Sequence, residues 1–178
     1  MLPVDAHADP PDSRDIAVSI HRGDGAIDVD VDLLVKATPQ EVWNVLTDYD
    51  HMAEFVSNVA MSRIVHRADE KLEVAQASRL SFGPFEFKFD NLREIEFVPP
   101  TEVRSKVVGG DMKGSVFTTR LVAEGDATRI TNRGRFLLDR WIPPVIGTAV
   151  LEAETRKQFA EFRAEILRRK SRDSTNAR

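Results

Sequence analysis

The sequence contains no cysteine, and this absence excludes several kinds of site at once. Disulfides, thiolate-bound zinc, iron–sulfur clusters and cysteine nucleophiles all need the missing side chain. No serine lies in the G-x-S-x-G turn that exposes a hydrolase nucleophile. The four histidines are scattered, and no second histidine joins His51 at a metal-ligand spacing. We therefore predict no catalytic residue, no metal site and no cofactor, and we find little that favours an enzyme.

Long apolar runs and an excess of positive charge are missing as well. No stretch approaches the ~20 apolar residues that cross a bilayer, so we expect no transmembrane segment and leave peripheral membrane contact open. The first 15 residues lack the basic and apolar regions of a signal peptide, and we expect a cytoplasmic protein. A formal net charge of −4 argues against a DNA partner.

The composition fits one domain with a core of its own. The chain has 178 residues, of which 42% are hydrophobic and 30% are charged. We assign residues 16–170 to this domain, residues 1–15 to a disordered acidic tail and residues 171–178 to a flexible basic tail. A monomer and a homodimer both stay open.

Alternating apolar residues predict a β-hairpin over residues 16–35, because the period of two continues on both sides of a Gly-rich turn. Thr38, Pro39 and Glu41 then form the capping-box pattern that begins a helix. A second short helix follows, with Asp48 or Asp50 as its expected cap. Short turns separate six further strands, which predicts an antiparallel meander over residues 59–67, 72–82, 85–98, 103–108, 112–123 and 128–138.

A long helix is predicted over residues 142–170, which contain neither Gly nor Pro beyond Gly147. Its apolar residues lie on two sides of the helix. One side is a seam that we expect to anchor the helix to the sheet: Leu151, Thr155, Phe159, Phe162 and Ile166. The other side includes Ile146 and Val150, and we expect it to wall a cavity. The predicted fold class is α+β, a strongly curved antiparallel sheet wrapped around this C-terminal helix, with two short helices after the first long strand.

One stretch of the sequence resembles a known family. It reads Val35-Lys36-Ala37-Thr38-Pro39-Gln40-Glu41-Val42-Trp43 and continues through Leu46-Thr47-Asp48-Tyr49-Asp50 to Phe55-Val56-Ser57-Asn58-Val59. This pattern and the order of elements are similar to the polyketide cyclase/dehydrase and coenzyme Q-binding-like family of the START-like (SRPBCC, helix-grip) superfamily. The resemblance implies a deep hydrophobic cavity between the sheet and the long helix. It also implies ligands such as lipids, quinones or polyketide intermediates, and the superfamily includes a ribosome-association toxin.

Aromatic residues on the inward face of the predicted sheet are our candidates for the cavity wall. Cavities for small apolar ligands are lined in this way, with a few polar groups that fix orientation. The predicted ligand-binding residues are Phe55, Phe85, Phe87, Phe89, Arg93, Phe117, Asn132, Phe136, Trp141, Ile146 and Val150. Two alternatives stay open. The phenylalanines could simply fill a core, and a bulge after Phe89 could turn Arg93 to solvent, because a buried unpaired Arg is costly.

These patterns and the family resemblance together imply three possible functions. The first is the binding of a hydrophobic small molecule, which could be a lipid, a quinone or a polyketide-like aromatic. The second is a polyketide aromatase/cyclase, in which Arg93 would polarise a carbonyl group. The third is a ribosome- or protein-interacting module, for which Arg129, Arg133 and Arg135 form the only basic stripe of the domain.

Overall fold

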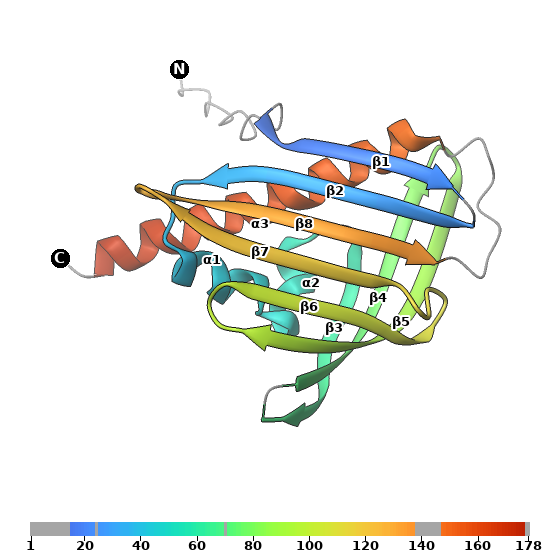
Figure 1. Ribbon diagram of the computed structural model, residues 1–178, viewed down its shortest axis with the longest axis horizontal. Helices are drawn as coiled ribbons and strands as arrows, with labels where there is room; N and C mark the ends of the chain where they lie inside the picture. The colour runs from blue at the N-terminus through green and yellow to red at the C-terminus, as the bar shows by residue number, and fades with distance from the viewer. Residues whose placement is uncertain (1–14, 24, 70, 138–146, 177–178) are drawn as a thin grey trace, which may run out of the picture.

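The computed structural model describes residues 15–23, 25–69, 71–137 and 147–176. Its eight strands form one antiparallel sheet in the order β1-β2-β8-β7-β6-β5-β4-β3 (Figure 1). The strands are β1 Ala17–Gly23, β2 Ala26–Val35, β3 Val59–Ala68, β4 Lys71–Phe82, β5 Phe85–Val98, β6 Glu102–Gly110, β7 Val116–Glu124 and β8 Ala127–Leu137. All neighbours from β3 to β8 follow one another in the sequence, so the predicted meander is confirmed.

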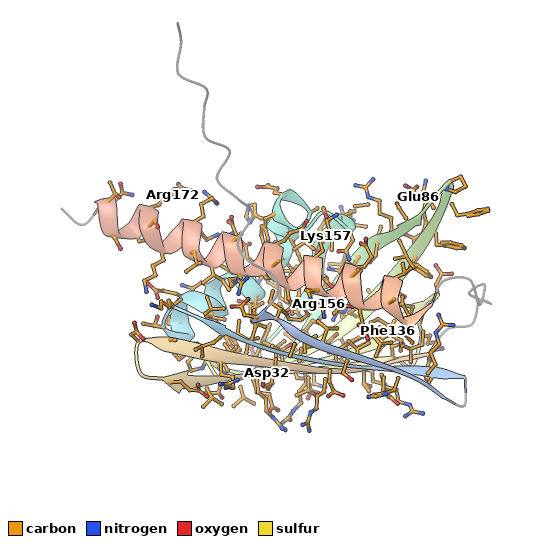
Figure 2. All side chains as sticks on the ribbon, turned by 90° about the horizontal axis from the view of Figure 1, so that it is seen from above. Asp32, Glu86, Phe136, Arg156, Lys157 and Arg172 are labelled. Atoms are coloured by element: carbon orange, nitrogen blue, oxygen red, sulfur yellow. The ribbon has the colours of Figure 1, made fainter. Side chains whose placement is uncertain are left out.

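The sheet is strongly curved and holds one long helix, α3 Thr148–Asn176, on one side. In Figure 1, β3 and β4 run steeply across the direction of β1, β2, β8 and β7. Figure 2 shows α3 lying along the sheet, where it packs against β1 and the first helix, α1 Pro39–Leu46. The predicted helix-grip fold is confirmed.

The predicted start of α1 is also confirmed. The backbone N–H of Glu41 donates to Thr38 Oγ1, and the N–H of Thr38 donates to the Glu41 carboxylate at 2.7 Å. This reciprocal pair satisfies two of the donors that a helix start leaves open. Pro39 occupies the first turn, where a missing N–H costs little.

The prediction that Asp48 or Asp50 caps the second short helix is wrong. The chain continues after α1 through the 3-10 helix η2 Tyr49–His51 and α2 Met52–Phe55, and neither has a side-chain cap. Asp48 instead contacts His51 Nδ1 at 2.7 Å and an α3 guanidinium, that of Arg169, at 2.8 Å. Asp50 accepts the backbone N–H of Ile64 in β3. Charged and backbone donors from elsewhere in the fold thus bind these carboxylates in place of the local N–H groups.

Strand β7 begins at Val116, four residues after the expected start of the strand at residue 112. Residues 111–114 form a turn, which Gly110 enters at a φ of 91°. A Cβ atom at Gly110 would lie 1.9 Å from the Asp90 carbonyl oxygen, so only glycine fits there. This turn carries Met112 to the sheet's concave side, where it lines a cavity.

The C-terminal end of α3 lies six residues beyond the predicted boundary at Lys170, so residues 171–176 are helical. No Gly or Pro interrupts this polar stretch, and the Lys170 ammonium donates to the Lys36 carbonyl at 2.8 Å. Residues 142–146 of the expected helix and residues 1–14 of the expected tail lie outside the described residues. Asp15 accepts two hydrogen bonds from the buried Arg163 of α3.

Apolar side chains fill the space between the sheet and α3 at the α1 end. The largest fully buried side chains include Leu33, Val42, Val45, Ile130 and Ile166, contributed by β2, α1, β8 and α3. Toward the N-terminal half of α3 the same space is not completely filled. A cavity remains there.

Candidate ligand-binding cavity

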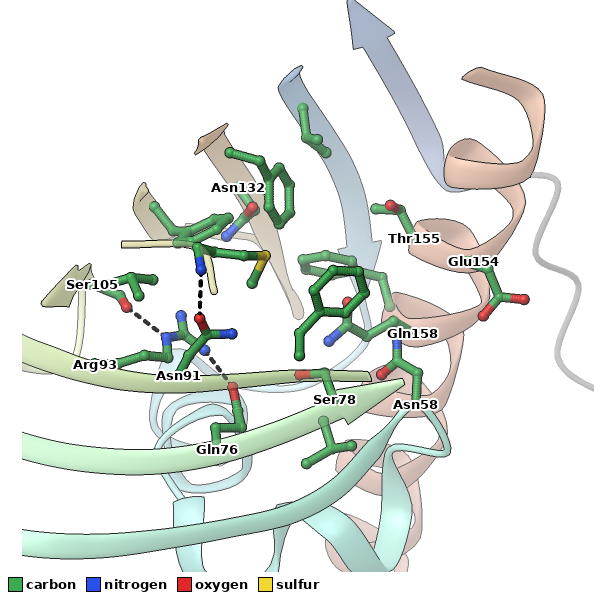
Figure 3. A pocket seen from close by; sticks show the side chains of 18 of the residues that line it. Asn58, Gln76, Ser78, Asn91, Arg93, Ser105, Asn132, Glu154, Thr155 and Gln158 are labelled. Carbon is green, nitrogen blue, oxygen red and sulfur yellow. Dashed lines mark hydrogen bonds between the residues drawn. The ribbon is translucent and has the colours of Figure 1, made fainter. Parts of the chain in front are cut away.

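The cavity lies between the concave face of the sheet, the η2–α2 turn and α3 (Figure 3). Its volume is about 270 Å³. Ligand pockets typically measure ~300–1,000 Å³, so this cavity suits a compact ligand. Most of its wall is apolar, and the apolar lining residues include Val29, Leu46, Met52, Phe89, Val107, Phe117, Phe136, Leu151, Phe159 and Phe162.

The inward direction of Arg93 follows from the register of β5. Strand β5 pairs with β4 without interruption from Phe85 to Glu96, so residues 89, 91 and 93 all face the same side. A register shift does occur beside Arg93, but the extra residue, Val108, belongs to the neighbouring strand β6. The bulge therefore leaves the alternation of β5 intact, and Arg93 lines the cavity.

Two neighbouring strands hold the Arg93 guanidinium in place. Its Nε donates to Ser105 Oγ and one terminal nitrogen donates to Gln76 Oε1, both at 2.8 Å. The amide nitrogen of Gln76 is directed to Ser62 Oγ at 3.4 Å, which fixes the Gln76 oxygen toward Arg93. The Phe117 ring covers the guanidinium at 5.3 Å from its centroid. Arg93 is therefore preorganised by neutral partners.

No carboxylate among the described residues forms an ion pair with Arg93. Burial lowers the pKa of Arg93, although a guanidinium keeps its charge. A buried cation without a counter-charge is costly. Its second terminal nitrogen has no acceptor among the described residues and remains available to the cavity. This end of the cavity is suited to an anionic or carbonyl oxygen.

Tyr49 adds a second donor to the same wall. It is only 4% exposed, and its hydroxyl makes no hydrogen bond to a described residue. Burial raises the pKa of Tyr49 to about 12, so the phenol stays protonated near neutral pH. The Tyr49 hydroxyl can therefore donate to an acceptor oxygen in the cavity.

A glycine in β8 makes room for one aromatic wall. Gly134 is paired with Phe117 of β7, and a Cβ atom at Gly134 would lie 2.6 Å from the Phe117 ring. The ring fills this space and packs edge-to-face on Phe136, with centroids 4.8 Å apart. A glycine inside a strand is the sequence signal for such a close approach, and the analysis of aromatic residues alone missed it.

The structure brings together five of the predicted residues on the cavity wall: Phe89, Arg93, Phe117, Asn132 and Phe136. Four others lie elsewhere. Phe85 is 60% exposed at the tip of the β4–β5 hairpin, beside Glu86, which projects beyond α3 in Figure 2. Phe87 and Val150 are partly buried but are not among the described lining residues. The Phe55 ring packs on the Phe162 ring, with centroids 5.9 Å apart, and does not line the cavity. Trp141 and Ile146 lie outside the described residues.

The N-terminal half of α3 contributes to the cavity through the seam that we expected to act only as an anchor. Leu151, Thr155, Phe159 and Phe162 line it, whereas Val150 does not. Residues four and three apart share one face of a helix, so the same face can wall the cavity and continue into the core. Lining residues that sequence reasoning missed include Tyr49, Gln76 and Ser105, which carried no distinctive pattern of their own.

The basic stripe of β8 is neutralised by the facing strand β2. Arg129 pairs with Asp32 at 2.6 Å, Arg133 with Asp30 at 3.3 Å and Arg135 with Asp28 at 3.3 Å. Arg133 and Arg135 face their aspartates directly in the strand register, whereas the register partner of Arg129 is Leu34, two residues from Asp32. The stripe thus lacks the free positive charge that binding to an acidic partner would use.

Fold and cavity together define a helix-grip protein with an apolar pocket. A family model described as "Polyketide cyclase / dehydrase and lipid transport" matches residues 35–163, and the chain belongs to this family. No curated protein matches the sequence significantly. Within the described residues, no helix is long and apolar enough to cross a membrane.

Solved structures share the fold at low sequence identity. The Zhui aromatase/cyclase from a Streptomyces species is 14% identical, with a TM-score of 0.67, over 81% of this chain and 95% of that chain. A START superfamily protein from Mycobacterium smegmatis is 8% identical, with a TM-score of 0.67, over 79% and 97%. A STAR-related lipid transfer protein from Xanthomonas axonopodis is 12% identical, with a TM-score of 0.65, over 85% and 98%.

Proposed function

We propose that this protein binds a compact hydrophobic molecule in the cavity and holds a carbonyl, carboxylate or phenolate oxygen of that molecule at Arg93. Phe89, Phe117 and Phe136 would contact the apolar body of the ligand, and Asn132 would contribute to the polar part of the wall. Burial of apolar area supplies about 25 cal/mol per Å² before ordering costs are subtracted. The family supports this function, because its model describes cyclases and lipid transport.

The observation that carries the proposal is the partly buried guanidinium of Arg93, which lines the cavity without a carboxylate partner among the described residues. A cation in a core is normally paired, because desolvation costs several kcal/mol. Here Ser105, Gln76 and the Phe117 ring orient the group but leave its charge uncompensated. An acceptor oxygen of a ligand would supply the missing partner.

Binding of 2-naphthoic acid, compared with 2-methylnaphthalene, tests this function by calorimetry or fluorescence titration. We expect the acid to bind more tightly to the unchanged protein, and Arg93→Met to weaken it by about 10- to 100-fold, since a hydrogen bond to a charged group contributes about 1.5–3 kcal/mol. Arg133→Met, on the exposed outer face, is the matched control and should leave binding unchanged. If both probes bind with equal affinity, the role of Arg93 is overturned. If neither probe binds, the cavity function is overturned.

A second candidate function is a polyketide cyclase, favoured by the Tyr49 hydroxyl beside Arg93. If both donors reach one acceptor, they stabilise the enolate or alkoxide oxygen that develops when a polyketone chain closes a ring. The family name and the aromatase/cyclase structure support this candidate. Incubation with a poly-β-ketone N-acetylcysteamine thioester should yield a cyclised product by mass spectrometry. If Tyr49→Phe and Arg93→Met form this product as fast as the unchanged protein, the candidate fails.

A further inference from the structure

Four neutral polar side chains line the cavity on its α3 side: Asn58, Ser78, Thr155 and Gln158. We call them the helix-side group. Asn58 ends the loop before β3, Ser78 lies on β4 opposite Val59, and Thr155 and Gln158 are three residues apart on α3. Figure 3 shows Asn58, Gln158 and Thr155 on one side of the pocket, and Arg93 with Ser105 on the other.

The polar side chains on the Arg93 side of the cavity have hydrogen-bond partners in the protein, whereas those of the helix-side group have none among the described residues. Arg93 is bonded to Gln76 and Ser105, and Asn132 donates to Thr119 at 2.7 Å. In contrast, no side chain of the helix-side group makes a hydrogen bond to any residue that the structure describes. The side-chain oxygen of Asn58 is buried and has no partner. The protein thus leaves hydrogen-bonding capacity unused on this side.

The backbone around the helix-side group is nevertheless fixed. The Asn58 carbonyl accepts the N–H of Arg79 at 2.9 Å, which ties the loop to β4. The N–H of Ser57 donates to the Glu161 carboxylate at 2.9 Å, which ties the same loop to α3. The open side-chain groups are therefore held at the cavity wall by bonds that do not use them. Such an arrangement is what a preorganised binding site requires.

The chemistry of the helix-side group indicates which ligand group it would take. Amides and hydroxyls each donate and accept, so together they match a ligand hydroxyl, which also does both. Leaving a buried polar group unpaired costs free energy, and a small rotation of the Asn58 amide toward a ligand hydroxyl would remove this cost. Glu154, one residue before Thr155, also lines the cavity, so an ammonium group is the competing choice.

We propose that the helix-side group recognises a hydroxyl at the end of the ligand opposite the oxygen held by Arg93. This inference rests on the proposed function and sharpens it. The ligand class is then an apolar, ring-sized body with an acceptor oxygen at one end and a neutral hydroxyl at the other. Gln76, which holds Arg93, and Ser78 of the helix-side group lie two residues apart on β4, about 7 Å along the strand, so the two ligand groups are held at different points along the cavity.

Matched naphthalene probes test the proposal. The affinity of 6-hydroxy-2-naphthoic acid is compared with those of 2-naphthoic acid and 6-(aminomethyl)-2-naphthoic acid, and the pair of 4'-hydroxybiphenyl-4-carboxylic and biphenyl-4-carboxylic acids repeats the comparison at greater length. We expect the hydroxyl to improve affinity by about three- to tenfold in at least one pair, as a neutral hydrogen bond does. Tighter binding of the ammonium probe than of both hydroxylated probes would overturn the proposal in favour of recognition by Glu154.

The gain from the hydroxyl must depend on the helix-side group. In Asn58→Leu or Gln158→Leu the affinity ratio of the hydroxylated and plain acids should fall toward one, whereas Arg93→Met should weaken both acids and keep the ratio. Asn44→Leu makes the same chemical change on the exposed surface of α1 and should keep the ratio of the unchanged protein. If the plain acid binds through Arg93 but no probe gains from its hydroxyl, this inference fails and the proposed function stands. If no acid binds, both fail.

Discussion

At the scale of single residues, Gly134 sets the position of the Phe117 ring. A side chain there would meet the ring at 2.6 Å, while the ring already contacts Phe136 and covers Arg93. Gly134→Ala must therefore turn the ring into the cavity or shift β8. We expect a loss of about 1–3 kcal/mol in the free energy of unfolding, as for other overpacked sites, and weaker binding of 2-naphthoic acid.

Thermal or denaturant unfolding and the same titration measure both effects. Gly23→Ala is the matched control, because no atom lies within 4 Å of the added carbon and the backbone there is not left-handed. If the two alanine variants unfold and bind alike, Phe117 does not depend on Gly134.

Glu165 is a second residue with a specific expected effect. Although buried, its carboxylate accepts three hydrogen bonds of 2.6 Å, two from Arg168 and one from Arg169. The Arg168 hydrogen bond, more than offsetting burial and assisted by Arg169, lowers the pKa of Glu165 below the ordinary 4.5. A lowered folded-state pKa stabilises the fold above the unfolded-state value and loses this contribution as the pH falls through the folded-state value.

We therefore expect Glu165→Gln to reduce the free energy of unfolding at pH 7 by about 1–3 kcal/mol. The difference from the unchanged protein should shrink as the pH is lowered below about 4.5. Denaturant unfolding at a series of pH values measures it, with the exposed Glu54→Gln as control. A difference that is constant from pH 7 to pH 3 would contradict the role of the ionised carboxylate.

The sequence left the direction of Arg93 open and did not indicate its partners. Alternation along β5 favours the face of Phe89 for residue 93, but only the uninterrupted pairing with β4 excludes a bulge in β5. Gln76 and Ser105 reach Arg93 only through the registers of β4 and β6, and the β6 register includes a bulge. Single-strand periodicity contains no information about such registers. For the same reason Tyr49 and the helix-side group could not be assigned to the cavity beforehand.

At the scale of elements, α3 combines two roles on one face. Leu151 and Thr155 line the cavity, whereas Ile166 is fully buried in the core at the α1 end. Phe159 lies between them and is 8% exposed. Its ring packs on the Phe162 ring, with the two ring centroids 5.9 Å apart. Anchor and wall are consecutive parts of one seam, so the position along the helix, not the side of the helix, decides the role.

Phe159→Ala should therefore affect both roles. We expect the free energy of unfolding to fall by about 3–5 kcal/mol, since a large buried ring is removed, and the enlarged cavity to bind 2-naphthoic acid differently. Lys157→Ala, exposed on the outer side of the same turn, is the control and should stay within about 0.5 kcal/mol of the unchanged protein. Equal stability of the two variants would show that the seam does not anchor the helix at this point.

Most elements could be predicted because each has a local signal. The capping box at Thr38 and the Gly-rich turn before β2 act within a few residues, and the structure has both where expected. Predictions failed where distant groups decide the outcome. Asp48 binds Arg169 of α3 instead of capping η2, and Phe85 is 60% exposed instead of lining the cavity.

At the scale of the whole molecule, charge and apolar surface are separated between the two faces of the sheet. The outer face of β2 and β8 is a ladder of paired aspartates and arginines, and the inner face holds the cavity. Paired surface charges contribute little stability, about 0–1 kcal/mol each, but they keep this face hydrated. Interaction with ribosomes, the oligomeric state and a cytoplasmic location stay predictions of the sequence.

The contacts between the β1 end of the chain and α3 determine when the fold can be completed during synthesis. Arg156 donates to the Ile16 carbonyl, Arg163 holds Asp15, and β2 pairs with β8 about a hundred positions away. Pairing of this kind is slow, because distant segments must first meet. Until the ribosome has released residues 148–166, the sheet presents its apolar concave side without a cover. A newly made chain therefore completes its pocket only after α3 has been synthesised, and a ligand can be enclosed only from that point on.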